Sequence, residues 1–258
     1  MDVAETYVQS GHEKWEQKDF KGAIEDYIRA AELASYVYPM WNCLLQQEVE
    51  WKEEQFIRII DICTEIISNN TQDIHTILFR GIAKDETYNR FRNKTILNEA
   101  IEDYSRAIEI NPNLSNSYFF RGYAKEFYLH LYKEAIEDYN LAIKVDNNNA
   151  HYYSCLAEAK EKIKDFDGAI QDYLKLIEFR PIYYVCLKLA KIYYNQKEYD
   201  QALEYVNKAI EINPDDYSLA QELKEVILLK NIEQIELIED DFSLKLRLIP
   251  SRIAVDSS

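Results

Sequence analysis

The side chains that could carry out chemistry in this chain are few and widely spaced. Catalysis and metal binding need histidines, cysteines or carboxylates that converge on one point. The 258 residues hold four histidines and four cysteines, which are His12, His75, His130, His151, Cys43, Cys63, Cys155 and Cys186. No two cysteines have CxxC spacing, and His12 has no second histidine one helical turn further on. The sequence therefore predicts no catalytic residues, no metal site and no cofactor.

The glycines and the carboxylates also give no indication of an enzyme. With 5 glycines the chain contains no GxGxxG, phosphate-loop or GxSxG motif. Carboxylates are abundant, but most occur as Glu-Asp pairs, which we assign to the solvated sides of helices. We expect the protein not to be an enzyme.

We expect the cysteines to be small core residues in a reducing, cytoplasmic environment.

The balance of charges excludes two kinds of partner. Against 30 Lys and Arg stand 46 Asp and Glu, which gives a net charge of −16. Nucleic acids and anionic membranes are bound through basic surfaces. The sequence also shows no basic start and no apolar run of signal-peptide or membrane-spanning length. The expected partner is a protein or peptide, with no nucleic acid and no membrane.

The elements that would have to form a binding site come from an internal repeat. The phrase that begins at Ala100 and ends at Pro112 returns at Ala135, Ala169 and Ala202, and an earlier copy begins at Ala23. A weaker copy begins at Ile59, so the steps between copies are 36, 41, 35, 34 and 33 residues. This period predicts repeated helix pairs. The predicted units are residues 4–37, 40–73, 74–114, 115–149, 150–182 and 183–214, followed by a capping helix over 215–230.

Five units carry a small residue in the first helix, and four of these five also carry a later tyrosine. The small residues are Gly11, Gly81, Gly122, Ala157 and Ala190, and the tyrosines, four residues after the start of the phrase, are Tyr27, Tyr104, Tyr139 and Tyr173. A small residue lets two helices approach closely, and a tyrosine ring fills the space beside it. We assign these tyrosines to the core. Prolines 112, 181 and 214 end the second helices.

In these positions the units resemble tetratricopeptide repeats. The best matches are Tyr118, Gly122, Ala135, Tyr139 and Ala142 in one unit, and Tyr153, Ala157, Ala169, Tyr173 and Pro181 in the next. The resemblance covers roughly residues 4–214. Only the second unit departs clearly, since Gln47 replaces its small residue, and a helical hairpin outside the repeat pattern stays open there. The resemblance implies an all-α, right-handed superhelical solenoid of about six units that acts as a non-enzymatic interaction scaffold.

Two segments depart from the repeat. The third unit has an excess of seven residues, which includes the basic and aromatic stretch 88–94. That stretch is either a contact loop for a partner or, as we favour, the end of a longer helical hairpin. Residues 231–258 are expected to continue the last helix and end in a strand-like or disordered tail, because apolar residues alternate with polar ones over 242–249.

The first helices of a stacked helix-pair array line its concave surface. Counting along them from the small residues predicts a peptide-binding groove formed by Trp41, Trp51, Phe79, Phe119, Tyr123, Glu126, Phe127, Glu158, Tyr184, Lys188, Lys191 and Tyr194. Further members of the same faces are Trp15, Glu48, Asp85, Glu86 and Glu161. Such a groove is aromatic and acidic, with a basic edge, and suits a peptide that carries basic and apolar or aromatic residues. For each single aromatic, packing between units is the alternative.

Other functions stay open from the sequence. Some tetratricopeptide repeat proteins grip a C-terminal carboxylate with a fixed set of Lys, Asn and Arg, but Val8, His12, Phe119 and Tyr123 occupy the matching positions here. Binding of chaperone tails is therefore disfavoured. A self-assembling structural protein that uses its C-terminal tail, which would make the chain a homo-oligomer, and a peptide-sensing regulatory module are the alternatives to the scaffold.

Overall fold

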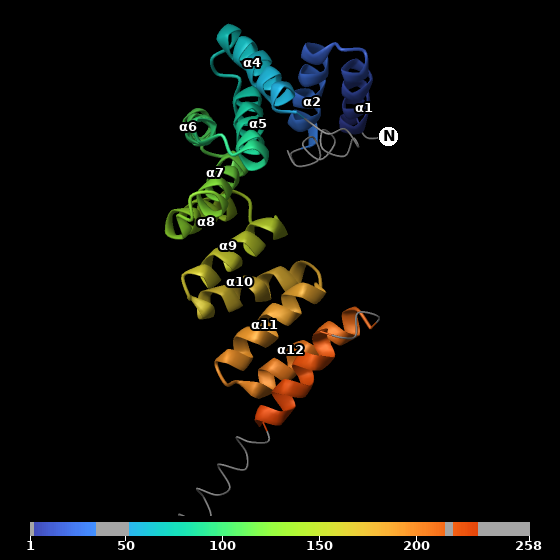
Figure 1. Ribbon diagram of the computed structural model, residues 1–258, viewed down its shortest axis with the longest axis vertical. Helices are drawn as coiled ribbons and strands as arrows, with labels where there is room; N and C mark the ends of the chain where they lie inside the picture. The colour runs from blue at the N-terminus through green and yellow to red at the C-terminus, as the bar shows by residue number, and fades with distance from the viewer. Residues whose placement is uncertain (1–2, 35–51, 215–218, 232–258) are drawn as a thin grey trace, which may run out of the picture. The chain divides into compact units, whose positions relative to one another are not determined.

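The computed structural model describes residues 3–34, 52–214 and 219–231 (Figure 1). All regular structure in these ranges is α-helical, as predicted. The helices are α1 (Val3–Glu16), α2 (Phe20–Ala34), α4 (Glu53–Asn69), α5 (Ile74–Phe91), α6 (Lys94–Ile110), α7 (Ser115–Phe127), α8 (Tyr132–Val145), α9 (Ala150–Lys162), α10 (Phe166–Phe179), α11 (Tyr183–Asn195), α12 (Tyr199–Ile212) and a further helix over 219–231. The predictions for Trp41, Trp51 and the tail 232–258 lie outside the described residues.

The helices pack as successive pairs. In residues 1–165, which form one compact unit, α1 packs on α2, α5 on α6 and α7 on α8 (Figure 1). In residues 166–258, which form a second compact unit, α11 packs on α12. The boundary between the units falls inside the predicted repeat 150–182, between α9 and α10.

A glycine and a tyrosine form the crossing points of α1 with α2, α5 with α6, and α7 with α8. Tyr104 and Tyr139 are completely buried, as are Tyr27 and Tyr173. A methyl group at Gly81 would stand 2.7 Å from Cε1 of Tyr104, and one at Gly122 would stand 3.0 Å from Cε1 of Tyr139. Two carbon atoms cannot approach that closely unless one of them is displaced. Glycine is therefore required here because the tyrosine ring occupies the space of a Cβ atom, and not because of the backbone conformation.

The seven extra residues of the third unit lengthen its hairpin. Helices α5 and α6 have 18 and 17 residues, whereas α7 to α12 have 13 or 14. The turn is closed by Arg92, whose backbone is left-handed with φ 59° and whose N–H donates to the carbonyl of Tyr88. Of the two alternatives for the stretch 88–94, a contact loop or a longer helical hairpin, the structure therefore shows the longer hairpin. Its end is only partly solvated, because Tyr88 is buried.

In the Glu-Asp pairs of the repeat, only the glutamate is exposed to solvent and the aspartate is buried or half-buried. This corrects the sequence-based assignment of both residues to the solvated side of the helix. Glu102 is exposed, but Asp103 is only 4 % exposed. Arg80 donates to both carboxylate oxygens of Asp103 at 2.5 and 3.0 Å, and Lys84 Nζ lies 2.9 Å from Oδ2. The aspartate sits three residues into the repeat phrase, one position before the buried tyrosine, so it faces the first helix of its own pair.

The same cluster recurs in the next repeat. Asp138 is 2 % exposed, and its carboxylate lies 2.6 Å from Arg121 Nη2 and 2.6 Å from Lys125 Nζ. In both repeats the arginine stands one residue before the glycine and the lysine three residues after it. This arrangement places two cations of one helix around a single carboxylate of the other.

The last repeat replaces the ion pair by a stack of aromatic rings. Tyr193 occupies the position of the lysine and Tyr205 that of the aspartate. Their ring centroids are 5.6 Å apart with an interplanar angle of 11°, and Lys208 Nζ lies 4.6 Å from the centroid of Tyr205. The crossing point thus accepts either a buried ion cluster or stacked rings.

We expect Gly81→Ala to destabilise residues 1–165 by about 1–3 kcal/mol, because the new methyl group must displace the ring of Tyr104. Gly22→Ala is the matched control, since its methyl group would meet only the carboxylate of Asp19, an exposed side chain that accepts from the Gly22 N–H and can turn away. Urea denaturation followed by circular dichroism measures both. An unchanged midpoint for Gly81→Ala would show that the crossing has spare room.

We expect Asp138→Ala to cost about 2–3 kcal/mol, because Arg121 and Lys125 would lose their shared anion while still partly shielded from water. Glu65→Ala is the control, since Glu65 pairs with Lys21 at the surface, where both side chains are about half exposed. An exposed pair contributes about 0–1 kcal/mol. Equal denaturation midpoints for the two variants would contradict a stabilising role of the buried cluster.

Candidate functional site

The candidate site is the face of residues 1–165 to which the first helices α5, α7 and α9 contribute. Helix α7 contacts both α5 and α9. Aromatic rings run along this face from one helix to the next. We call them the aromatic track, and they are Tyr88, Phe119, Tyr123, Phe127 and Tyr128.

The rings of the track touch one another in sequence. Tyr123 stacks on Phe127 with centroids 4.3 Å apart, and it meets Tyr128 edge-on at 6.2 Å. Tyr128 in turn meets Tyr88 edge-on at 4.9 Å, which links α7 to α5. At the other side Phe119 lies 6.1 Å from Tyr123. The track is therefore continuous across the first helices of two repeats.

Exposure divides the track into an outer and an inner part. Phe127 is 44 % exposed, and Tyr123 and Tyr128 are half-buried. Phe119 is buried in a core cluster and stacks on Tyr152 of α9 at 5.1 Å, so its ring packs between helices, which corrects its assignment to the groove surface. Phe127 with Tyr123 thus forms the accessible apolar surface, while Phe119 joins α7 to α9.

A buried carboxyl lies under the track on α7. Glu126 is 4 % exposed and accepts a hydrogen bond of 2.7 Å from the hydroxyl of Tyr139. Burial raises the pKa of the Glu126 carboxyl to about 7, the Glu158 carboxylate adds to the rise, and the Tyr139 hydroxyl and Lys162 oppose it. Near neutral pH this side chain is divided between its two protonation states.

The preceding repeat holds Asp85 at the equivalent position, four residues after its glycine. Burial raises the pKa of the Asp85 carboxyl well above its usual range, and the neighbouring Glu86 adds to the rise. The hydroxyl of Tyr104 faces this carboxyl and partly offsets the rise, but outside the geometry of an ordinary hydrogen bond. Among the described residues, Oδ1 of Asp85 has no hydrogen-bond partner.

The other residues that were predicted for the groove in the first unit have different surroundings. Phe79 is completely buried in the core cluster, so its aromatic ring packs between helices and offers no surface, which corrects its assignment to the groove. Trp15 packs edge-on against Phe20 at 4.7 Å. Trp41 and Trp51 lie outside the described residues. Of the acidic members, Glu158 on α9 is half-buried, and Glu86 on α5 is paired with Arg90 at 2.6 Å.

Four predicted residues belong to the second unit and are described by themselves. Tyr184 is 48 % exposed on α11, and Lys188 Nζ lies 5.4 Å from its ring centroid. Lys191 is exposed, and the ring of Tyr194 lies 5.8 Å from that of Tyr199. Lys188 and Lys191 are the two residues predicted as the basic edge of the groove, and both lie within residues 166–258.

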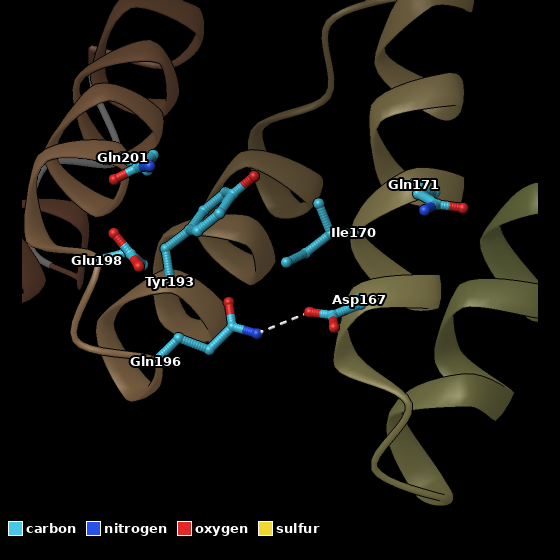
Figure 2. Close-up of a pocket in the computed structure, with 7 residues that line it drawn as sticks. All are labelled: Asp167, Ile170, Gln171, Tyr193, Gln196, Glu198 and Gln201. Carbon is cyan, nitrogen blue, oxygen red and sulfur yellow. Dashed lines mark hydrogen bonds between the residues drawn. The ribbon is translucent and has the colours of Figure 1, made fainter.

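The sequence did not point to a polar pocket in the second unit. Figure 2 shows this pocket, an open cavity of about 460 Å³ lined by Asp167, Ile170, Gln171, Tyr193, Gln196, Glu198 and Gln201. The side-chain amide of Gln196 donates to Oδ1 of Asp167 at 3.0 Å across its mouth (Figure 2). Glutamines near the ends of repeat helices are as common at solvated turns as in pockets. The sequence alone therefore could not distinguish this pocket from an ordinary turn.

Tyr88 and Tyr128 are members of the site that sequence reasoning missed. Tyr88 lies in the basic and aromatic stretch of the longer hairpin, and Tyr128 directly follows Phe127. In the described ranges, no three His, Cys, Asp or Glu side chains converge in a way that could hold a metal ion. Within the same ranges, no helix combines the length and hydrophobicity that crossing a bilayer requires.

We expect Glu126→Gln to remove part of the pH dependence of stability. Because the pKa of Glu126 is raised by folding from 4.5 to about 7, its contribution is fully present below pH 4.5 and is lost as the pH rises through 7. The wild type should therefore lose about 1–2 kcal/mol between pH 5 and pH 8 relative to the variant, roughly half of what the full shift would give. Urea denaturation at both pH values measures this difference, and parallel curves would contradict it.

Comparison with known proteins agrees with this architecture. Family models described as tetratricopeptide repeat match residues 4–36 and residues 183–216. The first range corresponds to α1 and α2, and the second to α11 and α12. No curated protein matches the chain.

Solved structures of MamA share the fold. A crystal structure of MamA is 22 % identical over 62 % of this chain and 89 % of its own, with a TM-score of 0.53. MamA from Desulfovibrio magneticus RS-1 is 15 % identical over 75 % of this chain and 98 % of its own, with a TM-score of 0.54. At these identities the likeness concerns the fold alone. The family matches show tetratricopeptide repeats at these two ranges, and the chain as described has a helical-repeat solenoid fold like that of the MamA structures.

Proposed function

We propose that this protein is a non-enzymatic scaffold that binds a peptide or protein segment on the aromatic and acidic face of α5, α7 and α9. The observation that carries the proposal is the stacked pair of Tyr123 and Phe127, in which Phe127 remains 44 % exposed. A large aromatic side chain held rigidly by its neighbour and open to solvent is the kind of residue that anchors protein interfaces.

The charge around this pair supports a basic partner. Glu86 on α5 and Glu158 on α9 are half-buried carboxylates of the same helices, and the whole chain carries a net charge of −16. Lysine or arginine side chains of a partner would be attracted from a distance and held near these carboxyls. An apolar or aromatic residue between them would pack on Phe127. Tyr184, Lys188, Lys191 and Tyr194 are proposed as a second contact surface, on residues 166–258.

The raised pKa of Glu126 has a structural explanation, which supports binding over catalysis. Catalytic carboxyls often have raised pKa values, so such a residue deserves to be tested for activity. Here the position belongs to the repeat, because Asp85 occupies it one repeat earlier and is buried in the same way. A carboxyl that recurs under the repeat tyrosine is explained by the packing of the helix pair.

The cysteines support a reducing compartment, and we propose the cytoplasm. Cys63, Cys155 and Cys186 are buried as free thiols. Burial raises the pKa of each of these thiols above its usual value, which keeps them protonated and unreactive.

We expect Phe127→Ser to reduce partner capture without loss of helix, because it removes the exposed ring and leaves the buried core intact. Leu141→Ser on α8 is the matched control, since Leu141 is 39 % exposed and lies on a second helix. The measurement is affinity capture from the lysate of the source cell with quantitative mass spectrometry, after circular dichroism has shown equal helicity.

Partners retained by the wild type and Leu141→Ser but lost from Phe127→Ser would support the proposed face. A loss of about 1–2 kcal/mol in affinity is expected for any purified partner. Identical capture by all three proteins would contradict the proposal and direct the search to the second unit.

A further inference from the structure

We propose that the face of α11 formed by Tyr184, Lys188 and Lys191 is covered by the chain's own acidic segment 239–242 when no partner is bound. We call this face of α11 the basic face. The inference rests on the proposed function and deepens it, because it names the ligand chemistry of the second contact surface. That chemistry is a run of carboxylates followed by an aromatic ring.

The basic face is built by a single helix. Its residues have the spacing i, i+4 and i+7, which places side chains on one face of a helix. Tyr184 is 48 % exposed, and Lys191 is exposed. Lys188 is half-buried, with its Nζ 5.4 Å from the ring centroid of Tyr184. The face therefore offers one aromatic plane and two positive charges to the same ligand.

The charge of this helix is opposite to that of the rest of the chain. Helix α11 contains two lysines and no carboxylate, whereas each of the other described helices carries at least one Asp or Glu. Lys191 directly follows the small residue Ala190, and one repeat earlier Glu158 directly follows Ala157. The last repeat thus reverses the charge at an equivalent position. In a chain with a net charge of −16, such a surface attracts the chain's own carboxylates.

The complementary segment is Glu239-Asp240-Asp241-Phe242. It holds the chain's single run of three adjacent acidic residues, and an aromatic residue follows directly. Its carboxylates match the two ammonium groups, and the ring of Phe242 matches that of Tyr184. The segment and the basic face are therefore complementary both in charge and in aromatic character.

The described chain ends close to α11. The helix over 219–231 shares a buried core cluster with α11, because Ile227 belongs to the same cluster as Cys186. At the end of that helix, Nδ2 of Asn231 donates to Oδ1 of Asp200 at 3.2 Å. Asp200 is the second residue of α12. The segment that follows Asn231 therefore begins beside the turn that joins α11 to α12.

The length of the connection allows the segment to reach the whole of the basic face. Glu239 is eight residues beyond Asn231, and a chain spans at most about 3.3–3.6 Å per residue, which gives about 26–29 Å. Helix α11 has 13 residues and is therefore about 20 Å long. A short connection also gives an effective concentration on the order of 1 mM, which favours the chain's own segment over that of a second copy.

The test uses the full chain and a carbodiimide, which joins an amine to a carboxylate when the two groups touch. Mass spectrometry then locates crosslinks between residues 239–241 and Lys188 or Lys191. Chains labelled with ¹⁵N are mixed with unlabelled chains, so a crosslink within one chain differs in mass from a crosslink between two copies. We expect crosslinks within one chain.

Lys197 is the internal control, because it is exposed and lies in the turn between α11 and α12, where the segment begins. A tail that only diffuses near its origin would react with Lys197 at least as much as with the basic face. We expect Lys188 and Lys191 to react at least about tenfold more than Lys197, as a preference from charge pairs and one ring contact would give.

Tyr184→Ser and Phe242→Ser test the ring contact, because both leave all reacting groups in place. Each should lower the crosslink yield at Lys188 and Lys191 about fivefold, within the range that one aromatic pair contributes. Phe179→Ser is the matched control, since Phe179 is 38 % exposed on α10 of the same unit, and its yield should stay unchanged. Circular dichroism compares the helicity of the variants. Phe242→Ser changes the tail alone, so it tests the inference even if Tyr184→Ser fails to fold.

Equal reaction of Lys197, an unchanged yield in Phe242→Ser or an equal loss in Phe179→Ser would overturn the inference. Crosslinks found only between labelled and unlabelled chains would also overturn it and assign the basic face to a second copy. The scaffold proposed for α5, α7 and α9 would survive each of these results if Phe127→Ser still reduced partner capture. It would fail separately if that variant captured the same partners as the wild type.

Discussion

The close approach of two helices at a glycine or alanine is the constraint on which the rest of this structure depends. The space left by the missing side chain is filled by the ring of a tyrosine from the second helix. In the unit of α7 and α8, Tyr139 lies against Gly122 and carries its hydroxyl to Glu126. The crossing that forms the core therefore also fixes the position and the hydrogen bond of a carboxyl on the candidate face.

The same crossing places the second buried carboxylate of each pair. Asp103 and Asp138 precede their tyrosines by one residue, so they face the first helix on the other side of the ring. There an arginine and a lysine surround each of them. In the last repeat, Tyr193 and Tyr205 stack at these positions instead. Buried ion clusters of this kind contribute more to the specificity of pairing than to net stability, which is consistent with their replacement by rings.

The acidic character of the candidate face follows from how the repeat distributes its carboxyls. Asp103 and Asp138 are neutralised inside the pairs, whereas Asp85 and Glu126 stand one helical turn beyond the glycine, away from those cations. Their burial without full compensation raises the pKa of both. A surface of this kind combines rigid aromatic rings with buried carboxyls, and the packing of the repeat places both.

The sequence by itself determined the repeat, the all-α class and the burial of the four tyrosines, because a period near 34 residues and the spacing of small and aromatic residues are local properties. It also named Tyr123 and Phe127, whose rings the structure stacks on one another. Only the tertiary structure decided that Phe79 is core, that the aspartates of the Glu-Asp pairs are buried, and that Tyr88 and Tyr128 complete the track. Those outcomes depend on which neighbouring helix covers each side chain, and one chain's local pattern does not contain that information.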